Sequence, residues 1–305
     1  MLDAQVTPGI VERQRLGRRR GQEIRGHAAS FSSFHEMVDS AHGARASVPA
    51  MIRITPASVA VALMFAAAPA HAIVGGAAPG QGDMARRVVM ISGARGNTCS
   101  GVALAADLIL TAAHCAVPKT ALLVRDIAPA RAGSAYAVRA VLVHPNYDPK
   151  SYARSRATAD VALLQLATPL ADTKPTRIGG RVPAPGERFT IAGAGATASG
   201  NGAGLGTTRA ANLVTVGQPS TLQFRLADAA GRAGALAGLG ACEGDSGGPV
   251  LDVSGNEPIM VGIISWSTGP SLSAGCGGLT GVTPLARYRA WIVKAAGELG
   301  VTLLP

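Results

Sequence analysis

Short apolar runs separated by turn residues fill the chain after residue 72. Several of them alternate apolar and polar positions with a period of two, which is typical of strands with one buried face. Gly, Pro, Asn and Asp lie between the runs and favour tight connections. The pattern predicts an all-β sandwich or barrels, with strands in the runs RVVMIS, GVALAADLILTAAHC, TALLVRD, YAVRAVLVHPNY, DVALLQLA, RFTIAGAG, ANLVTV, TLQFRL, PVLDV and IMVGIISWS.

One segment has helical spacing instead. In residues 286–299, Trp291, Ile292, Ala295 and Leu299 fall on one helical face, which predicts a C-terminal helix. Residues 193–211 are rich in Gly and Ala and predict a long flexible surface loop. No internal repeat or interdomain linker interrupts residues 73–305, so we expect a single domain there.

The composition agrees with a strand-rich fold, and the charge pattern bears on which classes of partner the protein could bind. Of 305 residues, 4% are aromatic and 39 are Gly, which favours short strands and turns over long packed helices. The formal net charge is +10. No basic run is interleaved with aromatic residues, so nucleic-acid binding has little support in the pattern. A generally basic surface is the simpler interpretation.

Residues 51–72 have the pattern of a secretory signal peptide. Arg53 precedes an apolar run over residues 59–68, and Ala70-His71-Ala72 has the small-x-small form of a cleavage site. The run is too short to span a bilayer. Residues 1–50 are then a non-native or dispensable extension, with translation starting at Met51. Arg18-Arg19-Arg20 could indicate twin-arginine export, but no apolar run follows it closely.

All four cysteines follow the signal and form no CxxC pair, which argues against a zinc site. Export to an oxidising compartment predicts two disulfides, and the sequence alone leaves three pairings open.

The stretch ACEGDSGGPV, residues 241–250, is either a solvated turn or the site of a nucleophile. A serine needs a base, and residues 73–305 hold two histidines, His114 and His144. The spacing G-x-S-x-G also fits an α/β-hydrolase elbow, but no histidine follows Ser246, as that fold requires. A subtilisin order would need Asp83, whose surroundings do not support it.

The remaining order is His, Asp, Ser, and here the chain resembles the trypsin-like (chymotrypsin family) serine proteases. The resemblance rests on five motifs in the family's order, IVGG (73–76), LTAAHC (110–115), DVALLQL (160–166), GDSGGP (244–249) and SW (265–266). It implies two six-stranded antiparallel β-barrels with the active site between them and a C-terminal helix.

The resemblance also assigns roles to residues. Ser246 is the nucleophile, His114 the general base and then acid, and Asp160 the carboxylate that orients His114. The N–H groups of Gly244 and Ser246 form the oxyanion hole. Asp245 pairs with the α-amino group of Ile73, freed here by signal peptidase without a zymogen stage.

In the family's pattern the disulfides are Cys99 with Cys115 and Cys242 with Cys276. Gly240 stands where trypsins have Asp, which predicts an uncharged primary pocket that does not favour Arg or Lys. The residues expected to contact substrate are Gly240, Ala241, Glu243, Ser265, Trp266, Ser267 and Gly281.

We therefore expect a secreted or periplasmic serine endopeptidase that acts on proteins or peptides through an acyl-enzyme. We expect a monomer, with no cofactor, no nucleic-acid partner and no stable membrane association after signal removal. No metal is expected, because the stretch that aligns with the family's calcium loop offers one carboxylate, Asp126. The alternatives are an inactive homologue acting as a binding module, or a processing protease of narrow specificity.

Overall fold

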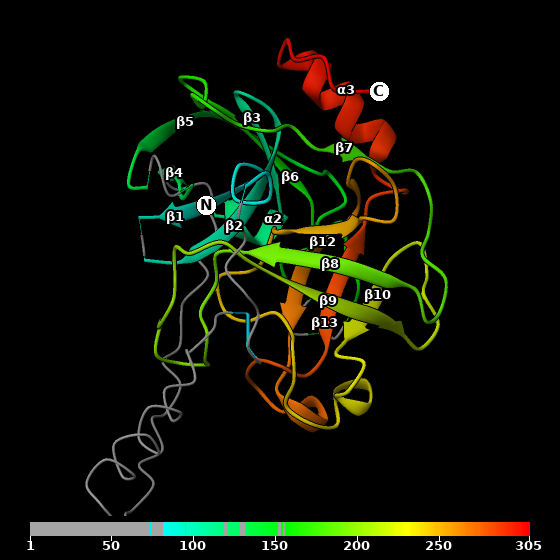
Figure 1. The fold of residues 1–305 in the computed structure, drawn as a ribbon. Coiled ribbons are helices and arrows are strands. Elements are labelled where there is room, and N and C mark those ends of the chain that lie inside the picture. The colour runs from blue at the N-terminus through cyan, green and yellow to red at the C-terminus, as the bar shows by residue number, and fades with distance from the viewer. Residues whose placement is uncertain are drawn as a thin grey trace, which may run out of the picture. The chain divides into compact units, whose positions relative to one another are not determined.

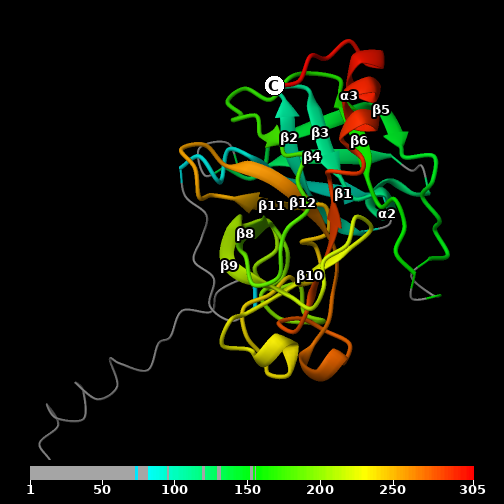
Figure 2. The same cartoon turned by 90° about the vertical axis from the view of Figure 1, so that its right-hand side faces the viewer.

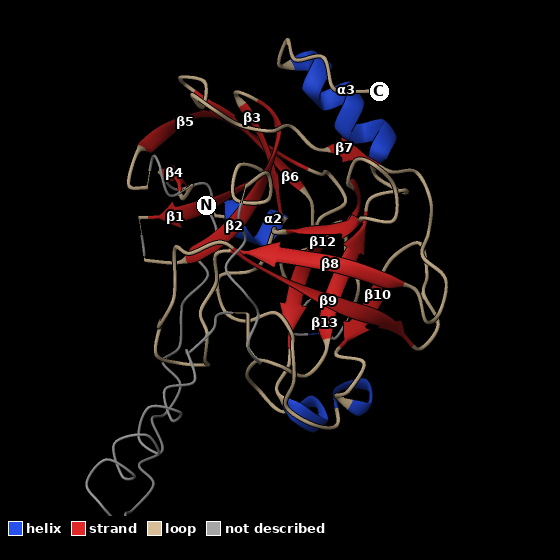
Figure 3. Cartoon of the chain, in the orientation of Figure 1, coloured by secondary structure: helices blue, strands red, loops and turns tan. Residues whose placement is uncertain are grey.

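The computed structural model describes residues 73–74, 82–94, 96–118, 121–128, 132–151, 154 and 156–305. The extension predicted for residues 1–50 and the signal peptide predicted for residues 51–72 lie outside the described residues. The remainder is built mostly from strands, as the red ribbons of Figure 3 show.

The first six long strands close into an antiparallel barrel in the order β1-β2-β3-β6-β5-β4. The middle strands β3 and β6 are buried along their whole length, because one face fills the barrel and the other is covered by the rest of the chain. The strands are β1 (Val88–Gly93), β2 (Thr98–Ala105), β3 (Leu108–Thr111), β4 (Leu122–Asp126), β5 (Ala135–Val143) and β6 (Ala162–Leu166).

A second antiparallel barrel follows in the order β11-β8-β9-β10-β13-β12, closed by pairing of β11 with β12. Phe189 and Phe224 meet in its core with ring centroids 6.2 Å apart. The two barrels form the upper and lower halves of Figure 2. The strands are β8 (Arg188–Gly193), β9 (Arg209–Val216), β10 (Phe224–Ala227), β11 (Pro249–Asp252), β12 (Ile259–Ser267) and β13 (Thr280–Pro284). A two-residue strand, β7 (Arg177–Ile178), adds to β12 in parallel.

The last helix, α3 (Arg289–Glu298), lies beside the first barrel (Figure 1). Its residues Ile292 and Ala295 are buried in the same cluster as the residues of β3 and β6. The other helices among the described residues are short: α2 (Ala113–Ala116) and the 3₁₀ turns η3 (Arg232–Gly234) and η4 (Pro270–Leu272). No helix in the described part of the chain is both long and apolar enough to cross a membrane.

The fold confirms the prediction of two six-stranded antiparallel barrels and a terminal helix. The helix itself spans 289–298 rather than 286–299. The long run GVALAADLILTAAHC makes two strands and α2, because Ala106 and Asp107 form a turn within it. Strand β13 was not predicted, since its sequence TGVTP carries Gly and Pro; it forms because β10 and β12 pair with it on both sides.

The loop predicted over residues 193–211 needs a correction at both ends. Ala194 and Ala196 are buried, because the chain there passes beside the buried Asp245, and β9 already begins at Arg209. The exposed part of the segment lies between these ends.

Candidate active site

His114 and Asp160 are held together by the pairing of two buried strands. β3 pairs with β6, with Thr111 opposite Ala162, so α2 after β3 lies beside the residues that precede β6. Asp160 Oδ2 lies 2.9 Å from His114 Nδ1, and Asp160 Oδ1 accepts the backbone N–H of His114 at 3.0 Å. These two bonds fix the ring so that its other nitrogen, Nε2, is free to face a reactant.

Each of the two groups shifts the pKa of the other. Burial alone would lower the pKa of His114, but the hydrogen bond and charge of Asp160 hold it above its ordinary value. Burial alone would raise the pKa of Asp160, but His114 and the hydroxyl of Ser265 hold it below. The pair therefore favours an ionised carboxylate beside an imidazole of increased basicity.

Ser265, expected from the sequence to contact substrate, has its hydroxyl turned to Asp160. Its Oγ donates to Asp160 Oδ2, the same oxygen that faces His114. Ser265 thus satisfies a second lone pair of a carboxylate that is only 4% exposed.

Ser246 lies in a loop that is bonded to both barrels. Its carbonyl accepts from the N–H of Ser100 in β2 at 2.8 Å, and the next residue, Gly247, donates to the carbonyl of Ile264 in β12 at 2.7 Å. The carbonyl of Ser246 also lies 3.7 Å from the sulfur of Cys115, the neighbour of His114. The hydroxyl of Ser246 makes no hydrogen bond with any described residue.

Glycine is required beside Ser246 by geometry. Gly247 has φ +84°, and a β-carbon there would lie 2.3 Å from the Ser100 carbonyl oxygen. Gly244 has φ +94°, and its carbonyl accepts the hydroxyl of Ser100 at 2.8 Å. The N–H groups of Gly244 and Ser246 donate to no described residue, so they remain available to an external acceptor.

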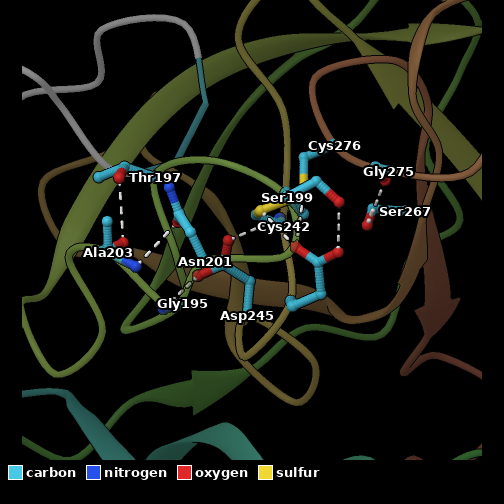
Figure 4. Close-up of a disulfide and its surroundings, with 12 residues drawn as sticks. Gly195, Thr197, Ser199, Asn201, Ala203, Cys242, Asp245, Ser267, Gly275 and Cys276 are labelled. Carbon is cyan, nitrogen blue, oxygen red and sulfur yellow. Dashed lines mark hydrogen bonds between the residues drawn. A yellow bond between two sulfur atoms is a disulfide. The ribbon is translucent and has the colours of Figure 1, made fainter.

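Asp245 is fully buried between backbone donors. Its Oδ1 accepts from Gly195 N at 2.8 Å, drawn in Figure 4, and its Oδ2 from Cys242 N at 2.9 Å. Burial raises the pKa of Asp245 to about 7, despite these two bonds. A positive charge beside Asp245 would therefore offset the large free-energy cost of burying its ionised carboxylate.

Ile73 enters the core of the second barrel. Its side chain is 1% exposed, and the carbonyl of Val74 accepts from Gly240 N at 3.3 Å. Ile73 has φ +49°, which is an outlier for a β-branched residue. The segment that begins at Ile73 is thus docked beside the loop that carries Asp245.

Both disulfides brace the loops of this site. Cys99 is bonded to Cys115, next to His114, and Cys242 is bonded to Cys276 (Figure 4). This is the pairing that the family resemblance implies. Glu243, beside the second disulfide, is exposed and accepts the hydroxyl of Ser199 at 2.7 Å.

A cavity of about 750 Å³ opens beside His114. Of the seven residues expected to contact substrate, Ser265 and Trp266 line it. Gly240 and Ala241 are buried, and Gly281 lies under the indole of Trp266. Ser267 bonds to the carbonyl of Gly275 at 3.4 Å instead.

Sequence reasoning missed several residues of the site. Ser100, which joins the Ser246 loop to β2, gave no signal beyond an ordinary strand position. Arg156 and Arg225 line the cavity. The alternation in β10, where Phe224 and Leu226 are buried, indicates that Arg225 faces outward, but not which cavity it meets.

Two antiparallel barrels with a His–Asp pair and a glycine-framed serine between them define a serine endopeptidase of the double-barrel class. The trypsin family model matches residues 73–292, and the chain belongs to that family. Relatives include trypsin of Sarcophaga bullata, 30% identical over 70% of this chain and 84% of the relative. A trypsin-like protease of Streptomyces glaucescens is 31% identical over 79% of this chain and 90% of the relative. Trypsin iota of Drosophila melanogaster is 30% identical over 66% of this chain and 79% of the relative. The protein is accordingly a hydrolase of protein or peptide substrates.

Proposed function

We propose that this serine endopeptidase acts through an acyl-enzyme with Ser246, His114 and Asp160 as its triad. The observation that carries the proposal is the pair of hydrogen bonds between His114 and Asp160, which aims Nε2 of the ring away from the carboxylate. The loop that carries Ser246 is hydrogen-bonded to both barrels. An inactive homologue would have no need of an imidazole held in this way.

In the proposed reaction, Ser246 Oγ attacks the carbonyl carbon while its proton passes to His114 Nε2. The carbonyl electron pair moves to the oxygen, which accepts hydrogen bonds from the N–H groups of Gly244 and Ser246. When the C–N bond breaks, His114 gives the proton to the leaving amine. Water then attacks the acyl-enzyme by the same route and releases Ser246.

We also propose that cleavage after Ala72 switches the oxyanion loop on. The freed α-ammonium of Ile73 would pair with Asp245, whose burial makes an unpaired charge costly. The strained φ of Ile73 supports this proposal. The angle is defined only while residue 72 is bonded to Ile73, so cleavage after Ala72 removes the strain. Signal peptidase is the proposed agent, with export to the exterior or periplasm as a monomer, and residues 1–50 are proposed to be dispensable.

The primary pocket is proposed to be uncharged and not to favour Arg or Lys. Gly240 offers no side chain, and a β-carbon there would lie 3.1 Å from the α-carbon of Gly277. Asp160, already engaged, is the one carboxylate among the described residues that line the cavity. A processing protease of narrow specificity is compatible with the same residues.

Fluorophosphonate labelling tests the proposal. The wild-type protein should be labelled at Ser246. Ser246→Ala should keep its fold but lose the label, and its kcat should fall about 10⁶-fold. Ser199→Ala, which changes an exposed serine bonded to Glu243, serves as the control and should stay active. Labelling at another serine, or an active Ser246→Ala protein, would overturn the assignment.

A further inference from the structure

The cavity beside His114 carries uncompensated positive charge. Arg156, from the segment before β6, and Arg225, from β10, both line it. Both are exposed, and neither forms an ion pair with any described residue. Asp160 is the sole acid on the described part of its wall, and it already faces His114 and Ser265.

The sheet places Arg225 next to the indole that lies over the cavity. Arg225 pairs with Gly281, and Gly281 pairs in turn with Trp266. Paired residues in neighbouring antiparallel strands point to the same face. Because the residue between them has no side chain, Arg225 and Trp266 share one surface of the cavity.

A second cavity of about 550 Å³ continues the first and shares Arg156 with it. It adds Arg287 and His144. Burial and the charge of Arg287 lower the pKa of His144, so His144 is neutral near pH 7. Asp148 is the acid on the described wall, but its carboxylate lies 3.6 Å from Arg154 and accepts the N–H of Lys150.

We propose that Arg225, Arg156 and Arg287 form a basic track that selects substrates with acidic side chains within a few residues of the cleaved bond. The proposal rests on the proposed function, since it makes this cavity the place where the substrate chain lies. Arginine suits the role because its planar guanidinium can hold a carboxylate with two hydrogen bonds. Glu or Asp in the substrate would supply a negative charge free to pair with these arginines, since Asp160 and Asp148 on the described walls already have other partners.

Peptide cleavage gives the first test. Peptides carrying Glu, Gln or Lys at each of the four positions before the cleaved bond are compared by kcat/KM, using protein expressed from the full chain. Glu should exceed Gln by about 2- to 5-fold at one position or more, the size expected of one exposed ion pair. The preference should shrink as salt is added.

Single substitutions test which arginines select acidic substrates. Arg225→Gln and Arg156→Gln should each lower the Glu/Gln ratio of kcat/KM toward one, because each substitution should slow cleavage of the Glu peptides more than cleavage of the Gln peptides. Arg188→Gln is the matched control, because Arg188 is an exposed arginine of β8 that lines neither cavity, and it should keep the ratio. Equal cleavage of Glu and Gln peptides at every position would overturn the proposal. Acid selected directly before the cleaved bond would support the arginines and contradict the uncharged primary pocket.

Measuring peptide binding tests the basic track separately from the proposed catalytic triad. Fluorescence anisotropy of labelled Glu and Gln peptides on Ser246→Ala reports affinity without turnover. A lower Kd for the Glu peptide, lost in Ser246→Ala/Arg225→Gln, supports the track even if the protein proves to cleave nothing. Equal Kd values for the two peptides would overturn the track even if the protease is active.

Discussion

The indole of Trp266 lies directly against the α-carbon of Gly281. A β-carbon at position 281 would lie 1.9 Å from Cε2 of Trp266, so the ring occupies the space that any side chain there would need. Trp266 follows Ser265, which bonds to Asp160. Its position is therefore tied to the candidate active site.

Gly281→Ala should displace this ring. The protein should fold, but kcat/KM should fall by about 10- to 100-fold, because small displacements near reacting groups are costly. Tryptophan emission measures the movement, and peptide hydrolysis measures its effect. Gly180→Ala is the control, since its β-carbon would meet only Arg289 Cδ at 3.9 Å. Unchanged emission and kinetics in Gly281→Ala would show that the ring is not held there.

The pH dependence of hydrolysis should reflect the raised pKa of His114. His114 must be neutral to accept a proton, so kcat/KM should rise with pH through an apparent pKa above 6.5. Asp160→Asn removes the charge that raises this pKa and should move the acid limb to lower pH, with a loss of about 10⁴ in kcat. An acid limb that does not move in Asp160→Asn would contradict the coupling.

Gly247→Ala should destabilise the fold by about 3 kcal/mol or more. The new β-carbon would lie 2.3 Å from the Ser100 carbonyl oxygen, in a backbone conformation with φ +84°. Gly96→Ala is the matched control: its φ is +81°, but nothing lies within 4 Å, so only the backbone cost of about 1 kcal/mol remains. Urea unfolding of both proteins measures the difference, and equal midpoints would refute the steric argument.

Stability should depend on pH through Asp245 while residue 72 is attached to Ile73. The pKa of Asp245 is raised to about 7, so between about pH 4 and pH 7 the folded state holds a proton that the unfolded state has lost. The free energy of unfolding should therefore fall as pH rises across this window, by an amount of the order of 4 kcal/mol.

The form that begins at Ile73 should lack this decline, because the α-ammonium stabilises the ionised carboxylate. Urea unfolding at pH 4, 5.5 and 7 of both forms, in a Ser246→Ala background that prevents self-cleavage, gives the comparison. Asp245→Asn should abolish the decline in the longer form. The same slope in both forms would show that Ile73 does not pair with Asp245.

Much of the fold was predictable because strand periodicity is local. Alternating and continuous apolar runs placed ten strand-forming segments, and the motif order implied the double barrel. β13 was missed because TGVTP has a weak local preference and forms a strand only between two partners. The two strands within the run GVALAADLILTAAHC were merged, since its turn at Ala106-Asp107 lacks Gly or Pro.

The sequence by itself determined the family, through short motifs of adjacent residues such as GDSGGP (244–249). Only the tertiary structure decided which distant residues meet. Ser265 reaches Asp160 across 105 positions, and Arg156 and Arg225 face one cavity from different barrels. The physical reason is that such contacts depend on barrel closure and strand register, which pair residues far apart in the chain and leave no local pattern.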